Sequence, residues 1–499
     1  WAGIEAYNSK GNKIIGNIIS SNGRGVELSG SNNTLSYNNV TRNGGLGIDL
    51  YRSIFHYSVL SNNNTIFGNN VIDNGDGISL YWCDHSYISQ NNVSDNSNNG
   101  IILEGSSNNT ISENNITESR GWIFDAGISL KSSWFGYSDY NNIIRNNLTN
   151  NNCGIRLRFS YHNNIRNNMV INNDEGIIID CSQGNLLRDN NLTGNTKNFG
   201  VYTEPSWWTG LITCQDFIHY IDASNTVNGK PIRYLVNQRD LTINSSDIGY
   251  LGLINCTNIR IRDVTLMNNS QGLLLAFTTN STIENATIAH NTVGVHVLCS
   301  DRNTISACTV TKNGFGINLY HSSLNNITKN TLTYNTGFYG GGIVIGRLPL
   351  SWGVLAGSTS VIPSEDNIIS CNTISNSGGY EEGGIVLMGS GITHTIVAGN
   401  TIKNNVAGIY ITYNASNTKI YHNNFIDNKK QVYIDEGYGA AVNIWDNGYP
   451  SGGNYWSDYA GVDAKRGPNQ DLPGSDGIGD TPYVIDPDNR DRYPLMIPW

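Results

Sequence analysis

The chain has 499 residues, of which only 14% are charged, and its formal net charge is -10 at pH 7. Ordinary soluble domains carry roughly 25% charged residues, whereas here glycine, with 55 residues, and asparagine are over-used. The acidic balance and the absence of any Lys/Arg run argue against nucleic acid as a partner. The most apolar stretch, 341–363, is interrupted by Arg347, Ser351 and two prolines, so we expect no transmembrane segment in this chain.

A glycine followed by an aliphatic, any residue and a second aliphatic recurs from the first residues onward. Several neighbouring glycines, such as Gly3 and Gly25 or Gly154 and Gly176, lie 22 residues apart. The motif occurs at Gly3, Gly25, Gly47, Gly77, Gly100, Gly127, Gly154, Gly176 and Gly200, and again at Gly272, Gly294, Gly316, Gly342, Gly384 and Gly408. A repeat of this length indicates a solenoid.

Between the glycines lies a second motif, Asn-x-Ile-x-x-Asn-x-Ile, as in NTISENNI (109–116) and NNIIRNNL (141–148). Each piece alternates apolar and polar residues over three to five positions and then turns at Gly or Asn, which predicts short strands rather than helices. Three such strands in about 22 residues predict an all-β parallel β-helix whose rungs stack about 4.8 Å apart. We interpret the Asn columns as structural, with each amide bonded to the Asn one rung away.

The breaks in the repeat predict four parts. Residues 1–206 form a first solenoid, 207–250 an insertion, 251–436 a second part of the solenoid, and 437–499 a C-terminal cap rich in Trp, Tyr and Asp. The insertion contains an Asn-Gly-Lys-Pro turn (228–231) between two apolar segments, which predicts a hairpin-like excursion.

The repeats, the segment IDASNTVNGKPIRYLVNQ (221–238) and the ending from GGNYWSDYAG (452–461) to residue 496 together resemble NosD-like parallel β-helix repeat proteins, in particular archaeal cell-surface members. The resemblance covers nearly the whole chain and implies a right-handed β-helix. Such repeats serve carbohydrate-binding proteins, sugar hydrolases and lyases, and surface-layer components. The four Met and nine scattered His lack the Met/His-rich pattern of copper handling that the name implies.

The outward positions of the glycine motif predict two clusters. In the first, Glu5, Glu27 and Asp49 stack on successive rungs beside Tyr7 and Tyr51. Carboxylates one or two rungs apart match the roughly 5 to 9.5 Å used in glycoside hydrolysis, and aromatics beside carboxylates suit a sugar groove. The alternatives are a solvated acidic face or an interface at the first rungs.

The second cluster is Glu104, Lys131, Arg158, Asp180 and Glu204, whose alternating charges predict an ion-pair ladder across rungs. The resemblance adds another interpretation, because uronate lyases on this fold use Lys or Arg with bound calcium. Lys131 and Arg158 are the candidates for that role.

The Asp-rich tail is the candidate metal site. Asp471, Asp476 and Asp480 lie in DLPGSDGIGD, a glycine-rich loop with the carboxylates and carbonyls that calcium prefers. A loop rich in Asx turns is the alternative. No other cofactor is predicted.

The cysteines and the Asn-x-Ser/Thr sequons allow further predictions about disulfides and glycosylation. The eight cysteines show no CxxC spacing and are either buried small side chains or disulfides. Asn-x-Ser/Thr sequons, which predict glycosylation and hence an extracellular or cell-surface chain, begin at Asn32, Asn39, Asn63, Asn92, Asn108, Asn115, Asn147, Asn191, Asn244, Asn255, Asn268, Asn280, Asn285, Asn326 and Asn414.

The favoured prediction is an extracellular structural protein, a glycosylated surface-layer, sheath or filament component that assembles with copies of itself. It follows from the sequons, from a first rung, AGIEAY (2–7), without a visible cap, and from the lack of a convincing catalytic set. The alternative is a β-helix protein that binds or cleaves polysaccharide and so has cell-surface glycans as partners.

Overall fold

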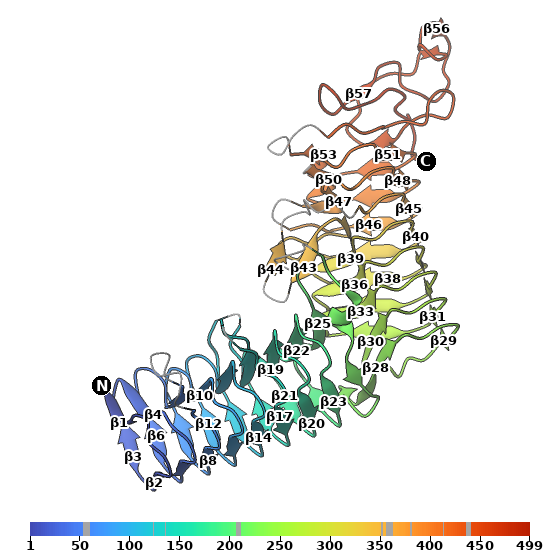
Figure 1. Cartoon of the computed structure of the whole chain (residues 1–499). Coiled ribbons are helices and arrows are strands. Elements are labelled where there is room, and N and C mark those ends of the chain that lie inside the picture. The colour runs from blue at the N-terminus through green and yellow to red at the C-terminus, as the bar shows by residue number, and fades with distance from the viewer. Residues whose placement is uncertain are drawn as a thin grey trace. The chain divides into compact units, whose positions relative to one another are not determined.

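The computed structural model describes residues 1–52, 60–122, 124–134, 136–205, 211–350, 353–355, 363–379, 382–412, 414–435 and 441–499. The chain forms two compact units, Trp1–Tyr234 and Leu235–Trp499 (Figure 1). The division falls inside the expected 207–250 insertion, and the boundaries expected at 206/207 and 436/437 lie outside the described residues. Across these residues the only helical element is the 3-10 turn η1 (Cys214–Phe217), and none is a helix long and apolar enough to cross a membrane.

The first unit contains three parallel sheets. Sheet A1, which carries the glycine motif, consists of β1 (Ala2–Ala6), β4 (Arg24–Leu28), β7 (Ile48–Tyr51), β10 (Ile78–Tyr81), β13 (Ile101–Glu104), β16 (Ile128–Lys131), β19 (Cys153–Arg158), β22 (Glu175–Asp180) and β25 (Lys197–Tyr202). Sheet B1 consists of β2 (Lys13–Ile15), β5 (Thr34–Ser36), β8 (Thr65–Phe67), β11 (Tyr87–Ser89), β14 (Thr110–Ser112), β17 (Asn142–Ile144), β20 (Asn164–Arg166), β23 (Leu186–Arg188) and β26 (Tyr220–Ile221). Sheet C1 consists of β3 (Ile18–Ser20), β6 (Asn39–Thr41), β9 (Asn70–Ile72), β12 (Asn92–Ser94), β15 (Asn115–Thr117), β18 (Asn147–Thr149), β21 (Met169–Ile171), β24 (Asn191–Thr193) and β27 (Thr226–Val227).

The second unit repeats this arrangement. Sheet A2, again with the glycine motif, consists of β30 (Tyr250–Ile254), β33 (Gln271–Ala276), β36 (Val293–Leu298), β39 (Phe315–Tyr320), β42 (Ile343–Ile345), β47 (Gly383–Met388), β50 (Ala407–Thr412) and β53 (Lys430–Ile434). Sheet B2 consists of β29 (Thr242–Ile243), β31 (Arg260–Arg262), β34 (Thr282–Glu284), β37 (Thr304–Ser306), β40 (Asn326–Thr328), β45 (Ile368–Ser370), β48 (Ile396–Ala398) and β51 (Lys419–Tyr421). Sheet C2 consists of β32 (Thr265–Met267), β35 (Thr287–Ala289), β38 (Thr309–Thr311), β41 (Thr331–Thr333), β46 (Thr373–Ser375), β49 (Thr401–Lys403), β52 (Asn424–Ile426) and β54 (Tyr455–Trp456).

Antiparallel pairs interrupt the parallel stacks. In the expected insertion, β27 pairs with β28 (Lys230–Val236) around Asn228 and Gly229, whose φ angles of 49° and 79° fit a tight Asn-Gly hairpin. The Asn-Gly-Lys-Pro sequence therefore predicted this turn correctly. The remaining pairs are β43 (Leu348–Leu350) with β44 (Gly353–Leu355), β55 (Lys465–Arg466) with β56 (Leu472–Pro473), and β57 (Tyr483–Val484) with β58 (Arg490–Asp491).

The stacking register follows the period of the repeat and confirms the expected parallel β-helix. Val26 pairs with Ile48 and Leu28 with Leu50 on the next rung, and all four side chains have 0% exposure. Aliphatic side chains therefore line each interior in columns, and a single rung could not bury them alone. All eight cysteines are free thiols, so the disulfide alternative is wrong and most of them are buried small side chains.

The glycine of the motif is required by close packing between rungs. A Cβ atom on Gly77 would lie 2.5 Å from the carbonyl oxygen of Gly100 and 2.6 Å from Val93 Cγ1. Real Cβ contacts are longer than this, so a side chain at this position would push neighbouring rungs apart. This contact explains why glycine recurs next to the first inward aliphatic of the A1 strands from β1 to β22; in β25 the equivalent residue is Asn198.

Buried asparagines form ladders at the corners between strands. Asn146 is 1% exposed, and its Oδ1 accepts hydrogen bonds from the backbone N–H and the Nδ2 of Asn114, at 3.1 and 3.0 Å. Its own Nδ2 donates to the carbonyl of Ile111 at 2.9 Å and to Asn168 Oδ1 at 3.0 Å. The ladder thus satisfies backbone groups that the turns leave unpaired, and the structural interpretation of the Asn columns is confirmed.

At the C-terminal end of the second unit, aromatic rings stack on the last rung. Trp456 of β54 lies between Phe425 and Tyr483, with ring centroids 4.3 and 4.2 Å away. Its indole N–H donates to the buried carboxylate of Asp491 at 2.9 Å. The residues after β53 therefore cover apolar core that would otherwise meet water.

Candidate functional site

The predicted carboxylates Glu5, Glu27 and Asp49 occupy equivalent positions on β1, β4 and β7 of sheet A1. Glu5 pairs in register with Glu27, and Glu27 with Asp49. Adjacent parallel strands lie about 4.8 Å apart, so the structure brings the three carboxylates into one row. We call this row, with its neighbouring tyrosines, the acidic face.

Burial increases along the row and changes its electrostatics. Glu5 is exposed, the Glu27 side chain is 17% exposed and Asp49 is buried. Arg24 Nη1 lies 2.9 Å from Glu27 Oε1 and 3.6 Å from Asp49 Oδ2. Burial raises the pKa of Asp49 to about 6, because the lowering by Arg24 is smaller than the desolvation and Glu27 opposes a second negative charge. Asp49 can therefore exchange a proton near neutral pH.

Aromatic side chains lie beside the carboxylates. The rings of Tyr7 and Tyr51 meet edge to face with centroids 6.4 Å apart, and Tyr51 pairs in register with Tyr81. Tyr81 in turn stacks on Trp82 at 4.6 Å. Burial, with further contributions from Glu27 and Asp49, raises the pKa of Tyr51 to about 12, so its hydroxyl remains a hydrogen-bond donor at neutral pH.

The second predicted cluster forms ion pairs along the same sheet. Lys131 Nζ lies 2.9 Å from Glu104 Oε2, and Arg158 lies 3.9 Å from both Asp180 and Glu204. The Arg158 guanidinium also lies 4.5 Å from the centre of the Phe124 ring. The expected ion pairs are present, but the charges do not alternate: Lys131 and Arg158 are register neighbours of like charge, and Asp180 pairs in register with Tyr202 rather than with Glu204. Both cations are paired with carboxylates of the same sheet.

Further along sheet A1, positions that face outward by register are nevertheless buried. Ile178 and Tyr202 pack with Ala126 and Cys153, and Arg156 is 2% exposed and pairs with Glu175. These side chains thus bury one another on the outer surface of the sheet. The period of the sequence alone does not reveal this burial.

Two of the predicted calcium ligands, Asp476 and Asp480, accept hydrogen bonds from the stretch of chain that precedes their loop. Asp480 Oδ1 accepts from the backbone N–H groups of Ala464 and Lys465, and Asp476 Oδ2 accepts from Gly467 N–H and Gln470 Nε2. In the described ranges, no group of three or more His, Cys, Asp or Glu could hold a metal ion. Asp471, Asp476 and Asp480 are therefore not brought together as one cluster, and calcium binding stays a prediction.

The sequon asparagines all lie at the surface. Each is exposed or half-buried, and the half-buried ones are Asn39, Asn147, Asn268 and Asn326. Several form an outer ladder on sheet C1, in which Asn92 Nδ2 donates to Asn70 Oδ1 at 2.8 Å and Asn115 Nδ2 to Asn92 Oδ1 at 3.0 Å. Their positions are compatible with glycosylation, which stays a prediction.

A pocket on sheet A2 was missed by the analysis of outward columns, which covered only the first solenoid. The same count from Gly408 places Tyr410 outward, and Tyr433 pairs with it in register on the next rung. The pocket around these tyrosines has a volume of about 390 Å³. Extending the column through Gly384 and Gly408 would have found Tyr410, but not Tyr433, which lies on a strand where Gln431 takes the place of the motif glycine.

Comparison with protein-family models gives two matches. Residues 249–425 match the right handed beta helix region, and residues 1–152 and 130–213 match the periplasmic copper-binding protein (NosD). Copper sites use imidazole and sulfur ligands, and in the described part of the chain no suitable metal-binding group occurs. The residues described thus do not fit a copper site.

Comparison with known proteins adds only distant likenesses. No curated protein matches this sequence significantly. Among solved structures, a mutant of the periplasmic alginate epimerase AlgG is 13% identical with a TM-score of 0.27, covering 73% of this chain and 77% of that one. The Azotobacter vinelandii mannuronan C-5 epimerase AlgE4 A-module is 11% identical with a TM-score of 0.24, covering 83% and 91%. XylC in complex with xylose is 10% identical with a TM-score of 0.30, covering 53% and 51%. Such low values assign neither substrate nor activity to this chain.

Proposed function

Because this chain is a NosD-like protein with a right-handed parallel β-helix, we propose that it acts outside the cytoplasm and binds polysaccharide along the acidic face of its first unit. The extracytoplasmic location is supported by the description of the matched NosD family as periplasmic. The observation that carries the binding proposal is the row of Glu5, Glu27 and Asp49 beside Tyr7 and Tyr51.

The chemistry of this face suits neutral or amino sugars. Carboxylates accept hydrogen bonds from sugar hydroxyl and ammonium groups, while aromatic rings pack against the apolar face of a pyranose. The Tyr51 hydroxyl adds a donor next to these acceptors. Since the groups repeat on successive rungs, an extended polysaccharide lying across the rungs would meet the same contacts more than once.

A glycan array of neutral and amino-sugar oligosaccharides, followed by titration of the bound ones, tests this proposal. We expect Glu27→Gln and Tyr51→Ala each to weaken binding by roughly tenfold, the loss from one good polar or aromatic contact. The matched controls are Glu113→Gln, at an exposed position directly after β14, and Tyr87→Ala, at an exposed position on β11 of sheet B1. Unchanged affinity in the Glu27 and Tyr51 variants, or no bound glycan, would refute the acidic face as a binding site. Release of reducing ends by the wild type would extend the role to cleavage.

A structural role at the cell surface is a second candidate, supported by the surface position of every sequon asparagine. We propose that the chain is glycosylated and assembles with copies of itself into a surface layer, sheath or filament. Light scattering and electron microscopy of the natively produced protein should then show ordered assemblies, and glycopeptide mass spectrometry should show modification at exposed sites such as Asn63. Monomers alone, across salt and calcium concentrations, would contradict assembly.

A further inference from the structure

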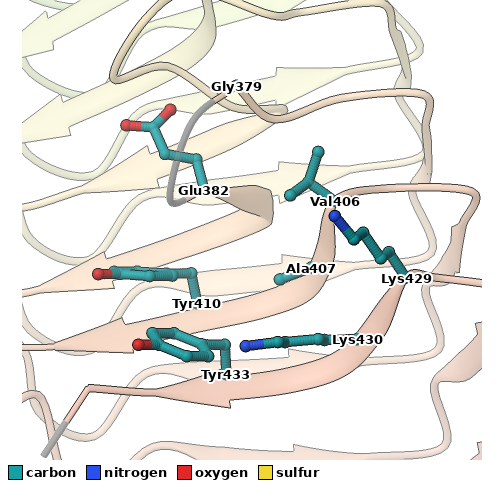
Figure 2. A pocket seen from close by; sticks show the side chains of 8 residues that line it. All are labelled: Gly379, Glu382, Val406, Ala407, Tyr410, Lys429, Lys430 and Tyr433. Atoms are coloured by element: carbon teal, nitrogen blue, oxygen red, sulfur yellow. The ribbon is translucent and has the colours of Figure 1, made fainter.

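The outer surface of sheet A2 differs in chemistry from the acidic face, although both use the same position of the glycine motif. Val293, Phe315, Val344, Val386, Met388 and Tyr410 form an apolar cluster there, with Tyr433 packed against it. At the end of this strip lies the pocket shown in Figure 2, which is lined by Gly379, Glu382, Val406, Ala407, Tyr410, Lys429, Lys430 and Tyr433. Its volume of about 390 Å³ is within the range of small-ligand sites.

The two tyrosines give the pocket a rigid aromatic wall. Tyr410 of β50 and Tyr433 of β53 are register partners, and their rings stack with centroids 5.1 Å apart and an interplanar angle of 22°. The Tyr410 hydroxyl lies 3.5 Å from Asp435 Oδ2. Because both tyrosines sit on strands of the solenoid, the wall is held without help from a loop.

The charged side chains that line the pocket and are not neutralised by ion pairs within the protein are both positive. Glu382 forms a buried ion pair with Arg347, whose Nη1 also donates to the Tyr339 carbonyl at 2.7 Å. By contrast, neither Lys429 nor Lys430 takes part in an ion pair within the described residues. Lys430 Nζ lies 4.1 Å from the centre of the Tyr433 ring, which holds the ammonium beside the aromatic wall. Both lysines are available to a ligand.

We propose that this pocket binds a hexuronate, an acidic sugar whose carboxylate lies between Lys429 and Lys430 while its ring packs on the wall formed by Tyr410 and Tyr433. The apolar side chains of Val406 and Ala407 complete the surface that meets the sugar ring. Charge-assisted hydrogen bonds from two ammonium groups select a carboxylate over the hydroxymethyl group of a neutral hexose. The site lies in the second unit and is independent of the acidic face.

Isothermal titration calorimetry of the full chain tests the proposal with trimers of galacturonate, glucuronate and mannuronate, each beside the trimer of the matching neutral hexose. We expect at least one uronate trimer to bind, with an affinity that falls as salt is raised. The double variant Lys429→Gln/Lys430→Gln should lose at least about tenfold in affinity for that trimer.

Two controls separate this result from general charge and from the proposed function. Lys403→Gln removes a lysine of sheet C2 that does not line the pocket and should leave the affinity for the uronate trimer unchanged. The neutral trimer reports binding at the acidic face and should keep its affinity in the Lys429→Gln/Lys430→Gln variant. The proposal is overturned if no uronate trimer binds, if the Lys429→Gln/Lys430→Gln variant retains full affinity for the uronate trimer, or if that variant loses affinity for the neutral trimer to the same extent. Melting temperatures confirm that the variants remain folded, as expected because Lys429 and Lys430 are exposed and Lys403 is half-buried.

Discussion

Replacing Asn146 with alanine should lower the free energy of unfolding of the first unit by about 3 kcal/mol, because buried polar groups left without partners cost about 1 to 3 kcal/mol each. The substitution removes the acceptor for the backbone N–H of Asn114 and the donor to the carbonyl of Ile111, both inside the solenoid. Since Asn114 and Asn168 are joined through Asn146, the loss also interrupts the ladder between neighbouring rungs.

Asn147→Ala is the matched control, since it alters the same residue type at the next position. Asn147 faces outward, is half-buried and donates one hydrogen bond to Asn115 Oδ1 at 2.9 Å. Chemical denaturation followed by circular dichroism should show a loss below about 1 kcal/mol for this variant. Equal losses in the two variants would mean that the inner ladder does not stabilise the solenoid beyond its outer counterpart.

The stability of the first unit should fall as pH rises, through Asp49. Folding raises the pKa of this carboxyl from 3.8 to about 6 by burial, so the protonated form is favoured in the folded state. The resulting stabilisation is fully present below 3.8 and is lost as pH rises through about 6. At about 1.36 kcal/mol for each pKa unit, the change amounts to about 3 kcal/mol.

The difference between the wild type and Asp49→Asn isolates this contribution from the other carboxylates. Relative to the wild type, the variant should gain about 3 kcal/mol between about pH 4 and pH 7 in denaturant titrations. Asp73→Asn, at an exposed position between β9 and β10, serves as the control. The prediction is contradicted if the difference in the free energy of unfolding between the wild type and Asp49→Asn stays constant across this pH range.

The repeat placed the predicted site residues of the solenoid, although not those of the tail. The glycine motif predicted that Glu5, Glu27 and Asp49 would share one row and that Glu104 and Lys131 would be neighbours of opposite charge, and both registers are present. Arg158 is the next neighbour of Lys131 and has the same charge, so the signs do not alternate along the sheet. What could not be predicted was accessibility. Asp49 is buried and contacts Arg24, a residue that precedes the motif and does not belong to either outward column.

The side-chain contacts in the tail loop and in the sheet A2 pocket likewise could not be predicted from the sequence. Asp476 and Asp480 are close in sequence. Their carboxylates nevertheless accept hydrogen bonds from the backbone N–H groups of residues 464, 465 and 467, on the preceding stretch of chain. In the sheet A2 pocket, Tyr410 could be placed outward by counting, but the contact of Lys430 with the Tyr433 ring on the same strand could not.

Periodicity therefore determined the parts of this protein that repeat: the short strands, the inward aliphatic columns, the glycine contact and the Asn ladders. Each of these depends on interactions between equivalent residues one rung apart, so spacing along the chain is enough to specify them. The tertiary structure decided how far each outward residue is buried and which charges are neutralised, as for Asp49, Arg156 and Glu382. These properties depend on side chains and loops that do not repeat, and hence on contacts that no period in the sequence encodes.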